Sequence, residues 1–175
     1  WAVELDLLSE LDRVCTKYNI KYFASGGTLL GAIRHHGFIP WDDDIDLAMA
    51  RKDYEKLCEI APKEFSHPYF FQTEYTDPGS LRGHAKLRNS NTTGILECEY
   101  PYSLKKIINQ GIFIDIFPLD GVPDEHDKYE TLERQALQLE KGFRRFTHFA
   151  YPRALDIRSY KSVIVNAGSL LMSHY

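Results

Sequence analysis

Four aspartates lie within five positions of the segment GFIPWDDDIDL, residues 37–47. Asp44 and Asp46 alternate with Ile45 and Leu47, and residues two apart on a β-strand project to the same face, about 6.6 Å apart along the strand. Two carboxylates on one face repel each other unless a cation lies between them. Mg²⁺ or Mn²⁺ prefers oxygen ligands and can still accept phosphate oxygens. The pair therefore predicts a metal site.

The other two aspartates of this segment, Asp42 and Asp43, have a simpler interpretation. Acidic side chains in a turn often hydrogen-bond their own backbone and remain solvated. An EF-hand calcium loop is excluded, because it needs Gly at position six and Glu at position twelve, where this chain has Leu47 and Asp53. We therefore expect Asp42 and Asp43 to shape the approach to the metal site.

A phosphate-binding turn is predicted shortly before the aspartates, at the sequence SGGT of residues 25–28. Glycine permits close approach of the backbone to a ligand. A helix that begins here would direct free N–H groups and about half a positive charge at the turn. A Gly-Gly turn can also be a simple connection, but the nearby aspartates favour Gly26, Gly27 and Thr28 as phosphate ligands.

A third carboxylate, Asp115, lies in the apolar segment GIFIDIFPLDG. An acid among such neighbours is costly unless it is paired, hydrogen-bonded or bound to a metal. A backbone or arginine partner is one explanation. The other is that Asp115 joins Asp44 and Asp46 on adjacent strands, where three carboxylates could hold one or two metal ions that act on a phosphoryl group. Asp115 is then a shared metal ligand or a base.

Three basic residues are candidates for binding a diphosphate: Arg34 in the helix after the Gly-Gly turn, and Lys86 and Arg88 on one face of the segment AKLRN. Arginine suits bidentate phosphate contacts, and lysine acts as a point charge. A surface position is the alternative for each of them. His84 has no metal-ligand spacing with other residues, so a surface or packing role is expected.

These candidates must be positioned by helices and strands, which the hydrophobic pattern predicts. Leu7, Leu11, Val14 and Tyr18 follow each other at steps of four, three and four, which is the stripe of an amphipathic helix. Further helices are predicted at 28–36, ending at Gly37, and at 51–61, 124–146 and 159–173. Strands are predicted at 20–24, 44–50, 68–75, 83–89 and 111–121. The pattern indicates an α+β fold, a mixed β-sheet flanked by helices.

Composition limits the kinds of partner. The net charge is −4, with no general basic character that would favour nucleic acid. No apolar run reaches the roughly 18 residues of a membrane span. Cys15, Cys58 and Cys98 have no C-x-x-C spacing, which fits a reducing compartment. The length predicts one domain over residues 1–175, and the apolar last residues suggest truncation at the C-terminus.

The stretches YFASGGTLLGAIRHHGFIPWDDDIDL and FIDIFPLDGVPD resemble the LicD family, which includes bacterial phosphorylcholine transferases and fukutin-related proteins. The resemblance runs over about residues 1–125 and implies a nucleotidyltransferase fold. It also implies Mg²⁺ or Mn²⁺ bound by the three catalytic acids, and donor phosphates facing the Gly-Gly turn. The segment AKLRNSNTTG is similar to the family's K-x-R-x-x-x-T stretch, which supports Lys86 and Arg88 as substrate ligands.

The resemblance also implies a reaction. A phospho-alcohol such as phosphocholine or ribitol phosphate would move from a CDP-activated donor to a hydroxyl of a glycan. The expected location is the cytoplasm, with membrane association through the acceptor, or the Golgi lumen for a protein of the fukutin-related type. Two alternatives stay open: nucleotidyl transfer to a sugar or small molecule, and a non-catalytic nucleotide-binding module.

Overall fold

The computed structural model describes residues 1–80, 82–95 and 108–150, with side chains described up to residue 142. The chain divides into two compact units, one formed by 1–96 with 107–121 and the other by 97–106 with 122–175. The first unit contains the sheet and three helices. The second contains the helix α5, His126–Ala150. The prediction of one domain over the whole chain stays a prediction, and the predicted helix at 159–173 lies outside the described residues.

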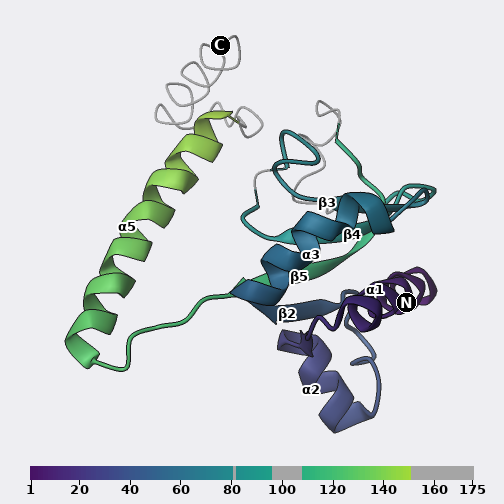
Figure 1. The fold of residues 1–175 in the computed structure, drawn as a ribbon, viewed down its shortest axis with the longest axis horizontal. Coiled ribbons are helices and arrows are strands. Elements are labelled where there is room, and N and C mark those ends of the chain that lie inside the picture. The colour runs from purple at the N-terminus through teal and green to yellow at the C-terminus, as the bar shows by residue number, and fades with distance from the viewer. Residues whose placement is uncertain (81, 96–107, 151–175) are drawn as a thin grey trace. The chain divides into compact units, whose positions relative to one another are not determined.

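The first unit is built on a five-stranded mixed sheet with the order β1-β2-β5-β4-β3 (Figure 1). Strand β5 runs parallel to β2 and antiparallel to β4, and the two outer pairs are antiparallel. The strands are β1 Phe23–Ala24, β2 Asp46–Ala50, β3 Tyr69–Gln72, β4 Ala85–Asn89 and β5 Ile112–Leu119. The predicted α+β class with a mixed sheet is confirmed.

Helices α1 (Ala2–Tyr18) and α3 (Arg51–Glu64) pack against one face of this sheet (Figure 1). The amphipathic stripe predicted for the first helix is confirmed, since Leu7, Leu11 and Val14 have no exposed surface. The residues of the same core on β2, β4 and β5 alternate along the chain and are Leu47, Met49, Ala85, Leu87, Ile114 and Ile116; β3 adds Phe71. Because side chains alternate along a strand, the residues between them face the opposite side of the sheet.

Several predicted boundaries differ from the structure. Helix α2, Gly26–His35, begins two residues earlier than predicted, so both glycines belong to its first turn. It ends at His36, whose φ of 55° is left-handed, and not at Gly37. Strand β2 begins at Asp46, so Asp44 precedes the strand instead of sharing its face. Within the described residues, no helix is long and apolar enough to cross a membrane.

Candidate functional site

The sheet register brings two of the predicted acids together. Strands β2 and β5 are parallel neighbours, and Asp46 lies directly opposite Asp115. Burial and the charge of Asp115 raise the pKa of Asp46. Residues that are 69 apart in sequence therefore place two carboxylates side by side on the face of the sheet opposite the core.

Asp44 belongs to the same acidic group although it precedes the strand. Burial is the largest cause that raises its pKa to about 6, followed by the charges of Asp46, Asp42, Asp43 and Asp115. Carboxylates in such a group favour either protonation or a bound cation. The structure thus gathers all three predicted metal ligands in one electrostatic cluster. Metal binding itself stays a prediction.

Asp44 and Asp115 line a cleft of about 680 Å³, whereas Asp46 is not among its lining residues. Asp42, Asp43 and Asp44 line it, and one carboxylate oxygen from each lies within 4.8 Å of the others. The other lining residues are Trp1, Glu4, Pro40, Trp41, Gly94, Ile95, Ile112, Phe113 and Asp115. Asp42 and Asp43 are expected to shape the approach or to lie just outside the ligand set, and the structure places them in the lining of the cleft. Oxygen ligands at this spacing fit a hard divalent cation such as Mg²⁺ or Mn²⁺.

The glycines of α2 lie against these aspartates. A Cβ at Gly27 would lie 2.4 Å from Asp42 Oδ2. Gly26 has a left-handed φ of +50°, and a Cβ there would lie 3.0 Å from Asp46 Oδ2. The close backbone approach that the sequence suggested therefore exists, but in this structure the groups approached are carboxylates. Phosphate binding at Gly26 and Gly27 stays a prediction.

Thr28 and Ser25 fix the start of β2. The backbone N–H of Asp46 donates to Thr28 Oγ1 at 2.9 Å, and the N–H of Ser25 donates to the carbonyl of Asp46 at 3.0 Å. Both contacts hold the backbone of Asp46 to the first turn of α2. Thr28 thus positions Asp46, the acid opposite Asp115, whereas its predicted role toward phosphate stays a prediction.

Two basic side chains contact the same oxygen of Asp115. Lys86 Nζ lies 2.5 Å from Oδ1, and His84 Nε2 lies 3.1 Å from it. Burial raises the pKa of Asp115, but the hydrogen bonds from His84 and Lys86 and their charges outweigh this effect, so the pKa falls below its usual value. Burial lowers the pKa of Lys86 to about 8, against the opposing effect of Asp115. At neutral pH the pair is therefore ionised.

His84 is the residue that the sequence interpretation missed. A surface or packing role was expected because it has no metal-ligand spacing, but only 18% of its side chain is exposed and it contacts Asp115. The sequence signal for this contact is the position of His84 two residues before Lys86. In an extended segment this spacing puts both side chains on one face.

The two predicted arginine ligands lie in different surroundings. Arg88 is 4% exposed, and it donates from Nε to Gln72 Oε1 and from Nη1 to the carbonyl of Gly111, both at 2.6 Å. Arg34 is exposed in the last turn of α2, and the described residues that line the acidic cleft do not include it. The structure therefore does not bring Arg34 to the acids, and binding of a diphosphate by either arginine stays a prediction.

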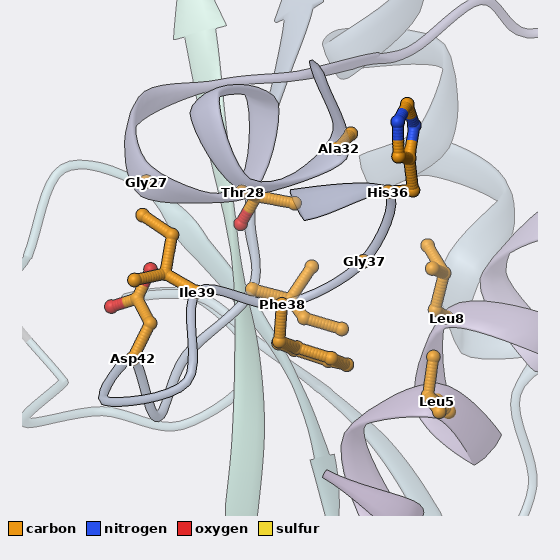
Figure 2. A pocket seen from close by; sticks show the side chains of 11 residues that line it. Leu5, Leu8, Gly27, Thr28, Ala32, His36, Gly37, Phe38, Ile39 and Asp42 are labelled. Atoms are coloured by element: carbon orange, nitrogen blue, oxygen red, sulfur yellow. The ribbon is translucent and has the colours of Figure 1, made fainter. Parts of the chain in front are cut away.

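A second cavity, of about 430 Å³, lies beside the first turn of α2 (Figure 2). Its walls are mainly apolar and include Leu5 and Leu8 of α1 and Phe38 of the loop after α2. Asp42 lines both this cavity and the acidic cleft. The loop that carries the aspartates therefore separates an apolar cavity from a strongly acidic one.

Comparison with known proteins shows the family of the chain. Residues 19–146 match the family described as "LicD/FKTN/FKRP, nucleotidyltransferase domain". The lipopolysaccharide cholinephosphotransferase LicD of Haemophilus influenzae is 36% identical over 121 residues, which are 69% of this chain and 43% of that protein. The human ribitol 5-phosphate transferase FKRP is 50% identical over 34 residues, 19% of this chain and 7% of that protein. The chain thus spans less than half the length of these relatives. It belongs to the LicD/FKTN/FKRP family of nucleotidyltransferase domains.

Proposed function

We propose that the protein is a metal-dependent phosphotransferase, which moves a phospho-alcohol from a CDP-activated donor to a hydroxyl group of a glycan. The observation that carries the proposal is the pair Asp46 and Asp115, opposite each other on parallel strands, with Asp44 in the same acidic cluster. The relatives support the transferred group, since one is named a cholinephosphotransferase and another a ribitol 5-phosphate transferase.

In this proposal Asp44, Asp46 and Asp115 hold Mg²⁺ or Mn²⁺. When bound, the cation offsets the charge that develops on the transferred phosphoryl group. Lys86 and His84 hold one oxygen of Asp115, and their effect on its pKa keeps this carboxylate ionised, which suits a metal ligand better than a base.

The transfer itself is a single displacement. The acceptor oxygen forms a bond to the phosphorus that carries the alcohol, and the bond from this phosphorus to the bridging oxygen of CMP breaks. CMP leaves with both electrons of that bond. The hydroxyl proton passes to a carboxylate of the cleft.

A turnover assay tests the proposal. Purified protein is incubated with Mg²⁺, a glycan acceptor and either CDP-choline or CDP-ribitol, and release of CMP is measured. Asp46→Asn is expected to lower kcat at least about 100-fold, because a charged group of the reaction centre is lost. Asp53→Asn, on α3 and outside the acidic group of Asp44, Asp46 and Asp115, is the matched control. Equal rates for Asp46→Asn and the wild type would contradict the proposal.

The two alternatives predict other products. A nucleotidyltransferase attacks the α-phosphorus of the nucleotide, so mass spectrometry would find a CMP-substituted acceptor instead of free CMP. A binding module would bind CTP or a CDP-alcohol in calorimetry without turnover. The retention of three acids in one cluster favours an enzyme over a binding module.

A further inference from the structure

The face of the sheet opposite the core has two matching rows of side chains. On β5, Phe113, Asp115 and Phe117 alternate with core residues and share this face. On β4 the register pairs Lys86 with Asp115 across the strands. His84 lies two residues before Lys86, and its ring centroid is 4.5 Å from that of Phe117.

These rows give the two basic side chains different contact geometry. Lys86 Nζ lies over the ring of Phe113, 3.4 Å from its centroid, and its ammonium can donate in three directions. His84 has a planar ring held against Phe117, so its Nε2 donates in one direction only. His84 thus adds a contact of fixed direction to the shorter ion pair that Lys86 makes with Asp115.

The two oxygens of Asp115 have different surroundings. Oδ1 is contacted by Lys86 Nζ and by His84 Nε2. Among the described residues, no hydrogen bond reaches Oδ2. An ionised carboxylate can only accept hydrogen bonds, so His84 must carry a proton on Nε2. The partners of Asp115 thus occupy one oxygen and leave the other for the cleft.

We propose that His84 is a positioning residue, which together with Lys86 occupies Oδ1 of Asp115 and so presents Oδ2 alone to a divalent cation in the cleft. The inference rests on the proposed function, because it assigns His84 a role toward the same metal site. Outer partners that orient a metal ligand typically change metal affinity or activity by about 10- to 100-fold when they are removed.

Two substitutions separate orientation of Asp115 from packing. His84→Gln can place an amide N–H near the position of Nε2 and so keeps a donor for Oδ1. His84→Leu keeps apolar contact with Phe117 but has no donor. If His84→Leu does not fold, His84→Asn replaces it, because its shorter side chain is polar but does not reach Oδ1. His126→Leu is the matched control, since this histidine is 80% exposed on α5.

The first measurement is Mn²⁺ affinity by calorimetry, which needs no turnover. We expect His84→Leu to raise the Kd about 10-fold, and His84→Gln and His126→Leu to stay within about threefold of the wild type. Urea denaturation checks that the variants are folded. In the wild type, ¹⁵N NMR is expected to show the His84 proton on Nε2.

The second measurement is steady-state turnover at saturating Mn²⁺. His84→Leu is expected to lower kcat about 10-fold with little change in KM for the CDP-alcohol, and His84→Gln is expected to restore most of the loss. Unchanged Mn²⁺ affinity in His84→Leu, or equal losses in the Leu and Gln variants, would overturn the role of His84. Absence of turnover in a wild type that binds Mn²⁺ would instead overturn the proposed function. A wild type that does not bind Mn²⁺ would overturn both.

Discussion

Replacement of Asp44 by asparagine tests whether the cleft contains repulsion that a cation relieves. Burial and four neighbouring carboxylates raise the pKa of Asp44 to about 6. Asp44→Asn removes the charge and keeps the size of the side chain. Without a divalent cation, the variant is therefore expected to be more stable than the wild type, although it loses turnover.

The expected magnitude follows from the pKa. An increase from 3.8 to about 6 corresponds to about 3 kcal/mol, at about 1.4 kcal/mol for each factor of ten in proton affinity. Because the side chain is only half-buried, solvent screens part of this effect, and we expect about 1–2 kcal/mol. Asp44 binds more protons in the folded than in the unfolded state between about pH 4 and about pH 6, so its contribution to the stability of the metal-free wild type falls as pH rises through this window.

Urea denaturation in EDTA at neutral pH measures the effect. The free energy of unfolding of Asp44→Asn is expected to exceed that of the wild type by about 1–2 kcal/mol, and the difference should shrink near about pH 4, where Asp44 is increasingly protonated in the wild type. Mn²⁺ should stabilise the wild type more than the variant, because only the wild type keeps the full set of acids. Asp53→Asn, on α3, is the control, with an expected change within about 0.5 kcal/mol.

Two results would refute this reasoning. One is an Asp44→Asn variant that is less stable than the wild type by more than about 1 kcal/mol in EDTA, which would mean that the ionised side chain makes net favourable contacts. The other is wild-type stability that rises relative to that of Asp44→Asn between about pH 4 and about pH 6, since a carboxyl with a raised pKa requires the opposite sign.

Other residues give further predictions. Gly26→Ala is expected to destabilise the protein by about 1–2 kcal/mol, because the left-handed φ of Gly26 is unfavourable for alanine. Gly37→Ala is the control, since a Cβ at Gly37 would have open space around it. In the same urea titration this control should change stability by less than about 0.5 kcal/mol. Arg88→Met leaves two buried acceptors without their donor and is expected to cost about 2–4 kcal/mol; a loss below about 1 kcal/mol would contradict a structural role. Burial raises the pKa of the Cys15 thiol to about 12, so peptide mass spectrometry should find it alkylated by iodoacetamide only after denaturation, and rapid native modification would contradict the buried position.

Much of the fold could be predicted from local patterns. The stripe of Leu7, Leu11 and Val14 is a periodic signal within one helix, and the alternation around Asp115 is a periodic signal within one strand. The boundaries were less accurate, because the start of β2 at Asp46 depends on hydrogen bonds to Ser25 and Thr28, which belong to another element. Local spacing contains no information about these contacts.

The sequence by itself determined which residues carry the acids and, for Asp46 and Asp115, which side of the strand they occupy, because the period of a strand follows from the backbone. Only the tertiary structure decided which side chains lie beside each acid. The register of β4 against β5 places Lys86 on Asp115 and brings His84 to the same oxygen, and the parallel pairing of β2 with β5 places Asp46 beside it. Arg88, on the same face, is bonded to Gln72 and Gly111. Strand register is set by the packing of the whole sheet, and this is why no spacing within one segment could reveal these contacts.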